Sequence, residues 1–289
     1  MARSRSSGSA RRVVLVTGAA RRIGRTIALA FARQGWDVAL HYGRSRRDAV
    51  ATAAEITALG RRALLLQADL ASEAAVLRLL PRVLRGLGRI DCVVNNASLF
   101  AYDDAAGTNY ASLSAHYVAN TAAPVLLARE LARHLADRGA DTEPASVINL
   151  LDQKLFNPNP DFLAYTLSKS ALHAATTLLA QALAPRVRVV GVAPGITLTS
   201  GEQTDAGFAQ AHTRTPLGRS STPQDVADAV LYAAGARALT GTTLLVDGGQ
   251  HLVPSTRDVM FLTEPAPQGG TPASEQKPAP RRRRARSSS

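Results

Sequence analysis

The chain has 289 residues, of which 46% are hydrophobic, enough to bury the core of one large or two small domains. Its formal charge of +12 would suit a nucleic-acid-binding protein. However, residues 13–263 carry a net charge of only +4, because most of the excess lies in residues 1–12 and 264–289. Aromatic residues make up 4% of the chain and no basic stripe interleaves with them, which argues against base stacking or groove recognition.

The two ends of the chain differ in composition from its middle. Residues 1–12 are rich in serine and arginine without an apolar segment, so we expect a disordered basic leader rather than a secretory signal. Residues 263–289 are rich in proline and arginine and cannot bury a core, so we expect a disordered tail. A solvated tail is the simpler interpretation, and weak electrostatic contact with nucleic acid or anionic lipid is the alternative.

Cysteine and histidine usage limits the site chemistry. Cys92 is the only cysteine, which excludes a disulfide framework and suits a reducing cytoplasm. The six histidines lack metal-ligand spacing, so no metal is expected. No apolar run approaches ~18 residues, so we also expect no membrane span.

Short apolar runs alternate with stretches of helical length and spacing between residues 13 and 262. Runs that are apolar throughout are typical of strands buried on both faces of a parallel sheet. This alternation predicts a single α/β domain, doubly wound around a seven-stranded parallel sheet. The predicted strands are Val13–Val16, Val38–Tyr42, Ala63–Ala68, Ile90–Val94, Val147–Leu150, Val187–Val192 and Thr243–Val246. The predicted helices are Arg22–Gln34, Arg46–Leu59, Glu73–Leu87, Tyr110–Ala136, Phe162–Ala184 and Pro223–Ala234.

A turn with the sequence Thr17-Gly18-Ala19-Ala20-Arg21-Arg22-Ile23-Gly24 joins the first strand to the first helix. Gly18 permits a tight turn, and Gly24 permits close packing of the helix. The N–H groups and partial positive charge at a helix N-terminus bind a pyrophosphate. A glycine-rich turn alone is a weak signal, but its position between a strand and a helix is the context of a dinucleotide-binding site.

This turn resembles the phosphate loop of the short-chain dehydrogenase/reductase family, which reads TGxxxGxG. Arg22 stands where the family has its middle glycine, and the resulting TGxxxRxG resembles the variant of pteridine reductases. The broad resemblance spans residues 13–249 and ends at Val246-Asp247-Gly248-Gly249. It implies a Rossmann-like fold, a nicotinamide cofactor and an oxidoreductase activity.

The end of the second strand indicates which cofactor is bound. Enzymes that prefer NAD place an acid there, ~20 residues beyond the glycines, to hold the ribose 2′-hydroxyl. Here the sequence reads His41-Tyr42-Gly43-Arg44-Ser45 without an acid, and Asp37 lies at the wrong end of the strand. Arg22 and Arg44 can both face a 2′-phosphate, with Ser45 as a further donor. We therefore expect NADPH, although Arg44 as an ordinary surface charge is the alternative.

The family resemblance implies further cofactor contacts. Asp69-Leu70 follows the third strand, at the position of the adenine contact. Asn95-Asn96-Ala97-Ser98 matches the Asn-Asn-Ala-Gly turn that supports the cofactor, and Pro194-Gly195 matches the turn on the nicotinamide side. The cofactor contacts expected are Gly18, Arg22, Ile23, Gly24, Tyr42, Arg44, Ser45, Asp69, Leu70, Asn95, Ala97, Lys169, Pro194, Gly195 and Thr197.

Tyr165 and Lys169 form the candidate catalytic pair. They are four positions apart, so both side chains lie on one face of a helix. A nearby ammonium stabilises a phenolate, which predicts a phenol pKa below ~10 and a proton donor that works near neutrality. The family resemblance implies that Lys169 also binds the nicotinamide ribose. It further implies that Asn120 matches the helix asparagine that orders a water beneath the lysine.

Asp152 is the most informative departure from the family. Thirteen residues before Tyr165 the family usually has a serine, whose hydroxyl donates to a substrate ketone. An ionised carboxylate repels a developing alkoxide, but it suits a substrate edge with N–H donors or a ring nitrogen that must be protonated. Pteridine reductases resemble this chain here too, with aspartate at the matching position. The alternative is that Asp152 only caps its loop and the catalytic serine has been lost.

Two residues after the fourth strand are candidates for substrate contact. A flat pterin can lie between Phe100 and the nicotinamide, with Ser98 near its edge. A hydrophobic plug of the loop fits Phe100 nearly as well. Tyr102 and the loop Thr197–Thr213 are further candidates. The expected substrate-binding residues are Ser98, Phe100, Asp152 and Tyr165.

These residues favour NADPH-dependent reduction of a dihydropterin, such as dihydromonapterin, dihydrobiopterin or dihydrofolate. The runner-up is a carbonyl reductase acting on a 3-oxoacyl thioester, a sugar or a small ketone. A non-catalytic NADP-binding sensor or scaffold is a third hypothesis, against which the intact catalytic residues argue. Family members usually form tetramers through helices that here include Tyr110–Ala136 and Phe162–Ala184, so a cytoplasmic homotetramer is expected.

Overall fold

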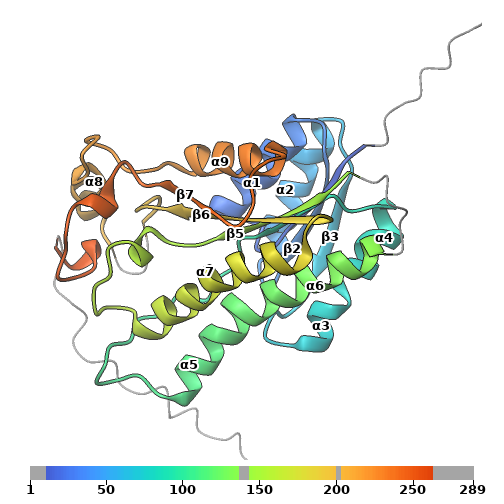
Figure 1. The fold of residues 1–289 in the computed structure, drawn as a ribbon. Coiled ribbons are helices and arrows are strands. Elements are labelled where there is room, and N and C mark those ends of the chain that lie inside the picture. The colour runs from blue at the N-terminus through green and yellow to red at the C-terminus, as the bar shows by residue number, and fades with distance from the viewer. Residues whose placement is uncertain (1–10, 137–142, 200–202, 263–289) are drawn as a thin grey trace, which may run out of the picture.

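The computed structural model describes residues 11–136, 143–199 and 203–262. The expectations for residues 1–10 and 263–289 fall outside these ranges. Seven parallel strands form one sheet in the order β3-β2-β1-β4-β5-β6-β7, with helices on both faces (Figure 1). The predicted single, doubly wound α/β domain is therefore confirmed. The strands are β1 (Val13–Val16), β2 (Asp37–Tyr42), β3 (Ala63–Gln67), β4 (Cys92–Asn95), β5 (Ala145–Leu150), β6 (Val187–Pro194) and β7 (Thr243–Val246).

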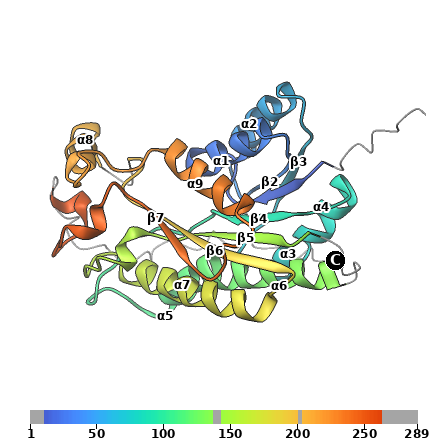
Figure 2. The same ribbon diagram turned by 45° about the horizontal axis from the view of Figure 1, so that its top comes forward.

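The helices form two layers that enclose the sheet (Figure 2). One layer holds α1 (Arg22–Arg33), α2 (Arg46–Ala58) and α9 (Pro223–Gly235). The other holds α3 (Glu73–Leu77), α4 (Leu79–Leu87), α5 (Tyr110–Tyr117), α6 (Ala123–Ala136) and α7 (Leu163–Leu183).

Strand β1 shows why the apolar runs contain no polar alternation. Val14 and Val16 pack into the core beneath α1 and α9, whereas Val13 and Leu15 pack into the core on the opposite face. Successive side chains of a strand point to opposite faces, so a strand covered on both sides must be apolar at every position.

Two predicted helices are interrupted. The helix predicted at Glu73–Leu87 divides at Arg78, because the ring of Pro81 clashes with the carbonyl of residue 77 in a continuous helix. The helix predicted at Tyr110–Ala136 contains a π-helical turn at Val118–Ala122. Such turns are frequent at functional sites, and this one contains Asn120.

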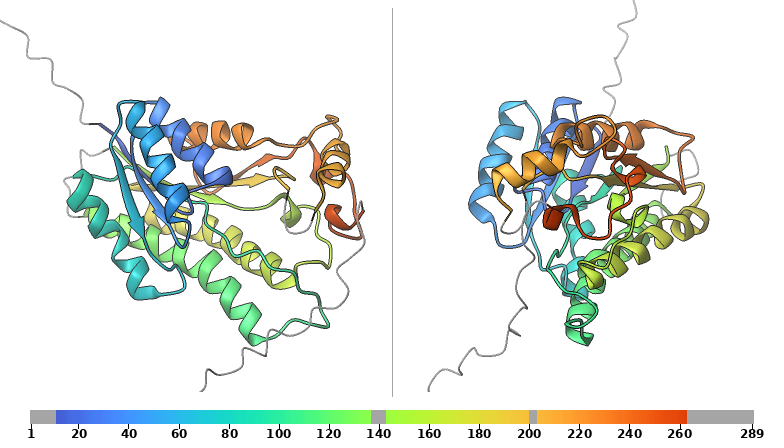
Figure 3. Two further views of the ribbon diagram at one scale, coloured as in Figure 1. Left: turned by 180° about the vertical axis from the view of Figure 1, so that it is seen from behind. Right: turned by 90° about the vertical axis from the view of Figure 1, so that its left-hand side faces the viewer.

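Several short elements were not predicted. They are α8 (Asp205–Thr213) and the 3-10 helices Gln153–Leu155, Gln250–Leu252 and Val259–Leu262. Helix α8 and the 3-10 helix Val259–Leu262 lie together at the end of the molecule where β5 and β6 terminate (Figures 1 and 3). At the other end, Arg12, assigned to the leader by sequence, places its guanidinium 4.2 Å from the ring centroid of Trp36. No helix among the described residues is long and apolar enough to cross a membrane.

Candidate active site

A cleft opens at the carboxyl ends of β1, β4, β5 and β6, the edge at which doubly wound sheets bind ligands. With its open mouth, the empty space measures about 1010 Å³. No three His, Cys, Asp or Glu side chains in the described part of the chain gather as metal ligands. Of the predicted site residues, the cleft brings together Arg22, Ile23, Ser98, Phe100, Asp152, Tyr165, Lys169, Pro194, Gly195 and Thr197.

The loops after β1 and β4 are locked together beneath the cleft. The Thr17 hydroxyl oxygen accepts the N–H groups of Asn96 and Ala97, each at 3.0 Å, and the Asn96 side chain donates to the carbonyls of Thr17 and Gly18. A methyl group at Gly24 would overlap the Gly18 carbonyl oxygen, so only glycine fits there.

The N-terminus of α1 is open to an anion. It has no side-chain cap and no acidic residue in its first turn, which leaves N–H groups and the helix dipole for a ligand. This cradle fits the pyrophosphate of a dinucleotide.

His41 supports the same loop and was not singled out by the sequence. Its Nδ1 accepts the Gly18 N–H at 3.1 Å, and its Nε2 lies 3.2 Å from the Ala68 carbonyl oxygen. Burial lowers the pKa of His41 to about 4, so the ring is neutral at pH 7. Because Nδ1 accepts, Nε2 carries the proton and donates to Ala68. His41 therefore ties the phosphate loop to the end of β3.

The residues expected around the adenosine end lie outside this cleft, after β2 and β3. Arg44 is exposed, and within the described residues its guanidinium has no ion-pair partner. The side chain of Arg22 is not directed towards Arg44. The Arg22 backbone is left-handed, with φ of 56°, and its guanidinium donates to the Thr199 carbonyl at 2.9 Å. The residues in this second group are Tyr42, Arg44, Ser45, Asp69 and Leu70.

Asn95 is placed inside the sheet rather than in the wall of the cleft. Its Nδ2 donates to Asn149 Oδ1 at 2.8 Å, and Asn149 in turn donates to the hydroxyl of Thr176 at 3.0 Å. The neighbouring Asn96 lines the cleft. The two asparagines therefore have different positions: Asn95 joins strands, whereas Asn96 faces the cleft.

Tyr165, Asp152 and Lys169 meet at the centre of the cleft. The Tyr165 hydroxyl donates to Asp152 Oδ2 at 2.7 Å, and Lys169 Nζ donates to the Leu150 carbonyl at 2.7 Å. Burial raises the pKa of Asp152 and lowers the pKa of Lys169 to about 8.

The predicted lowering of the Tyr165 phenol pKa was wrong. Burial and the adjacent Asp152 carboxylate raise it well above its ordinary value, because two acids that share a hydrogen bond oppose each other's ionisation. Burial therefore favours the protonated forms of Asp152 and Tyr165, whereas it favours the neutral form of Lys169.

Asp152 caps its loop, as one of the two sequence interpretations expected, and it also lines the cleft. Its Oδ1 accepts the Lys154 N–H at 2.9 Å and so caps the short helix Gln153–Leu155. Its Oδ2 accepts the Tyr165 hydroxyl. Capping therefore fixes the carboxylate in the orientation that faces Tyr165 and the cleft.

Asn120 connects the loop after β4 to α7. Its Oδ1 accepts the Leu99 N–H at 2.7 Å, and its Nδ2 donates to the Leu99 carbonyl and to the Ser168 hydroxyl, each at 2.9 Å. Ser98 also donates to Asn120 Oδ1 at 3.2 Å. The side chain therefore holds the Ser98 turn against the helix that carries Tyr165.

Aromatic side chains cluster at one side of the cleft, which Phe100 and Tyr165 line. Phe100 stacks on Phe162 with centroids 4.3 Å apart and meets the Tyr165 ring edge-on at 4.8 Å. Phe162 also stacks on Phe261 at 5.9 Å, and the ring of Tyr102 packs edge-on against both. Phe100 is thus a wall residue that is 43% exposed and covered on one face by Phe162.

The sequence missed the contribution of the C-terminal residues to this wall. Asp258, Val259 and Met260 line the cleft, and Lys154 lines it from the loop after β5. No local pattern marks these positions, because they reach the site through contacts between segments about a hundred residues apart.

Comparison with known proteins agrees with this geometry. A family model described as enoyl-(acyl carrier protein) reductase, one of the short-chain dehydrogenase models, matches residues 18–251. The structure of FolM alternative dihydrofolate reductase 1 from Brucella canis, complexed with NADP, has a TM-score of 0.80. It is 38% identical and covers 86% of this chain and 97% of its own.

Two relatives of known sequence point to different substrates. Pteridine reductase 1 of Leishmania tarentolae is 32% identical over 280 residues, covering 83% of this chain and 96% of its own. The granaticin polyketide synthase putative ketoacyl reductase 2 of Streptomyces violaceoruber is 36% identical over 251 residues, again covering 83% and 96%. The chain therefore belongs to the short-chain dehydrogenase/reductase family and is an oxidoreductase similar to the pteridine reductases within it.

Proposed function

We propose that the chain is an NADPH-dependent reductase of a dihydropterin-type substrate. NADPH is the cofactor: the N-terminus of α1 offers the pyrophosphate cradle, and Arg44 follows the carboxyl end of β2, where no acid is present. The Brucella structure at 38% identity is itself a complex with NADP. The observation that carries the pterin assignment is Asp152, hydrogen-bonded to Tyr165 at the position where a ketone reductase would have serine.

The chain's own residues would manage the proton while the bound cofactor supplies the hydride. The raised pKa values of Asp152 and Tyr165 keep a proton available to a ring nitrogen, directly or through a water. Lys169, whose Nζ donates to the Leu150 carbonyl, would hold the nicotinamide ribose. The exposed side of Phe100 offers a flat apolar surface for a planar ring.

Exchanging the carboxylate tests this assignment. Asp152→Ser should lower kcat/KM for 7,8-dihydrobiopterin by about 100-fold and raise turnover of a small ketone, because a hydroxyl replaces the carboxyl group that is proposed to take part in proton delivery. Asp152→Asn is the matched control: it keeps the shape and should lose pterin turnover without gaining the ketone. Retained pterin turnover in Asp152→Ser would overturn the proposal.

A carbonyl reductase remains the second candidate, favoured by the 36% identity to a putative ketoacyl reductase. In that case Asp152 would take no part in the proton transfer. Asp152→Ser would then improve ketone reduction while leaving any pterin activity intact.

The cofactor assignment has its own test. Arg44→Asp should lower kcat/KM with NADPH by about 10- to 100-fold while changing the value with NADH little, since a carboxylate repels a 2′-phosphate. The exposed Arg47 on α2 supplies the control Arg47→Asp. Equal losses with both cofactors would show that Arg44 does not face the phosphate.

We also propose that the protein assembles through α5 and α7 as a cytoplasmic homotetramer. Large apolar side chains on these helices are exposed: Tyr110 at 92%, Leu167 at 50% and Leu178 at 64%. An exposed apolar patch of this kind suits an interface. Light scattering should show a tetramer that Leu167→Asp dissociates, and a wild-type monomer would contradict the proposal.

A further inference from the structure

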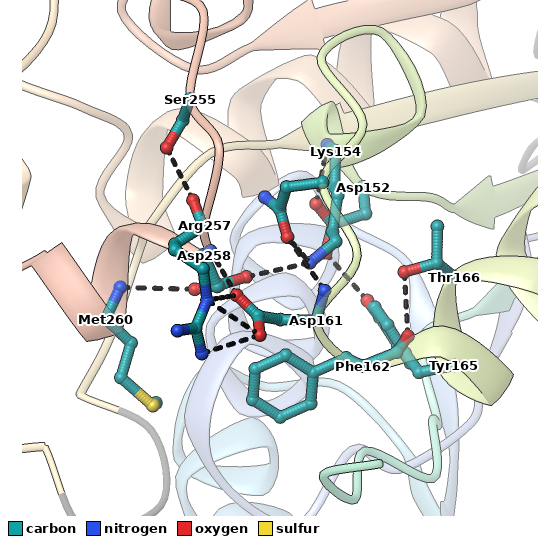
Figure 4. Close-up of polar contacts among 11 residues, drawn as sticks. Asp152, Lys154, Asp161, Phe162, Tyr165, Thr166, Ser255, Arg257, Asp258 and Met260 are labelled. Carbon is teal, nitrogen blue, oxygen red and sulfur yellow. Dashed lines mark hydrogen bonds and ion pairs between the residues drawn. The ribbon is translucent and has the colours of Figure 1, made fainter. Parts of the chain in front are cut away.

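The C-terminal segment Val253–Leu262 contributes to the lining of the cleft, and its Arg257 and Asp258 are held by Asp161 and Lys154 (Figure 4). Asp161, in the loop before α7, accepts Arg257 Nε and Nη2, each at 2.8 Å, and the N–H of Asp258 at 2.7 Å. The Asp161 side chain is only 4% exposed, so the bidentate pair is partly desolvated. This clamp fixes the backbone of Asp258 beside the cleft.

A second ion pair orients the Asp258 side chain. Lys154 Nζ donates to Asp258 Oδ2 at 3.2 Å and also to Asn159 Oδ1. The Lys154 side chain is 3% exposed, and a buried ammonium is costly unless it is paired. Lys154 Nζ further lies 5.4 Å from the ring centroid of Phe162, the ring on which Phe100 stacks. The pair is therefore part of the wall that a planar substrate would touch.

We propose that Asp258 is a second carboxylate of the substrate site, which accepts hydrogen bonds from the N–H donors of a planar nitrogen heterocycle. This rests on the proposed function. A carboxylate has about four acceptor positions, and the described residues use two of them, through Lys154 Nζ and the Met260 N–H, each at 3.2 Å. The side chain is 21% exposed in a residue that lines the cleft, so acceptor positions remain for a ligand.

The charge of Asp258 also affects the pKa values of Asp152 and Tyr165. The charged groups around Asp152 are Lys169 on α7, Lys154 on the short helix that Asp152 caps, and Asp258 on the C-terminal segment. The Asp258 charge opposes ionisation of both Asp152 and Tyr165, whereas Lys169 favours ionisation of Asp152. If Asp258 were only a counter-ion for Lys154, replacing Asp258 would not change substrate affinity in a variant that already lacks Lys154.

The test uses the full chain with 7,8-dihydrobiopterin and NADPH. Asp258→Asn should raise KM about tenfold, the effect of losing one charge-assisted hydrogen bond, while the Kd for NADPH stays unchanged. It should also move the alkaline limb of the kcat/KM profile to lower pH, because removing a negative charge lowers the pKa of Asp152. Lys154→Met should move this limb to higher pH, since it leaves the Asp258 charge unopposed.

The double variant Lys154→Met with Asp258→Asn removes the pair without leaving a buried charge. It carries the test if Asp258→Asn alone folds poorly, and its KM should stay raised about tenfold. Asp258→Glu should recover part of the affinity. A wild-type KM in the double variant, or an alkaline limb that moves in neither single variant, would reduce Asp258 to a counter-ion. Absence of dihydropterin turnover by the wild-type protein would instead refute the proposed function.

Discussion

The side of the cleft proposed to bind the cofactor (the cofactor side) and the side proposed to bind the substrate (the substrate side) are built in different ways. The cofactor side uses turns that directly follow strands, and its main contacts join Thr17 and Gly18 to the turn after the neighbouring strand β4. The substrate side depends on the C-terminal segment, where Arg257 meets Asp161 across 96 positions and Asp258 meets Lys154 across 104. The contacts of the cofactor side also join distant residues, 78 and 79 positions apart, but both of its turns carry a local sequence motif. The C-terminal segment carries no such motif.

The largest effect is expected from Tyr165→Phe, which should separate chemistry from cofactor binding. The variant loses the hydroxyl that donates to Asp152, so kcat should fall by about 1000-fold, within the range for loss of a general acid. The Kd for NADPH, measured by fluorescence titration, should stay within about twofold. If Tyr165→Phe kept more than a tenth of the wild-type kcat, Tyr165 would be excluded from proton transfer.

Gly24→Ala should disrupt the phosphate loop on the cofactor side. Its methyl group would overlap the Gly18 carbonyl and lie 2.5 Å from the Asn96 amide nitrogen. We expect a loss of about 3 kcal/mol in the free energy of unfolding, together with much weaker NADPH binding. Gly235→Ala is the control, because a methyl group there meets nothing within 4 Å. Equal stability of Gly24→Ala and Gly235→Ala would show that the loop has room for a methyl group at residue 24.

The same contrast explains which parts could be predicted. The strands, the phosphate loop and the Tyr165–Lys169 helix follow from periodicity and spacing, which local sequence encodes. The direction of the Tyr165 pKa was mispredicted because it depends on desolvation and on Asp152, which only the folded cleft brings together. Asp258 and Lys154 had no local signal, since each is placed by an ion pair between distant segments.

His41 makes the stability of the cofactor side depend on pH. Its pKa is lowered from 6.5 to about 4 by burial, so between these values the unfolded chain binds a proton that the folded chain does not. The contribution is fully present above pH 6.5 and is lost as the pH falls towards 4, by up to about 3 kcal/mol. Urea unfolding of the wild type and of His41→Gln at both pH values measures it.

The half-buried His173 supplies the control, His173→Gln, which should keep the wild-type pH dependence. If His41→Gln loses stability as steeply as the wild type between pH 6.5 and 4, His41 is not the titrating group.

The smallest expected effect concerns the clamp of the C-terminal segment. Arg257→Gln removes the bidentate pair with Asp161, whose arginine is 39% exposed, so the loss of stability should be about 1–2 kcal/mol. KM for the pterin should rise several-fold with an unchanged Kd for NADPH. Arg219→Gln, at an exposed pair with Asp225, is the control and should change neither. Weaker NADPH binding in Arg257→Gln would show that the two sides are not independent.

Initial rates of the purified wild-type protein test the central claim most directly. They should be measured with 7,8-dihydrobiopterin and with a panel of small ketones and 3-oxoacyl thioesters, using NADPH and NADH in parallel. We predict that kcat/KM is highest for the dihydropterin with NADPH, exceeding both the ketones and the NADH reaction by at least about tenfold. Efficient ketone reduction without turnover of any pterin would contradict the assignment of Asp152 as the residue that selects the substrate.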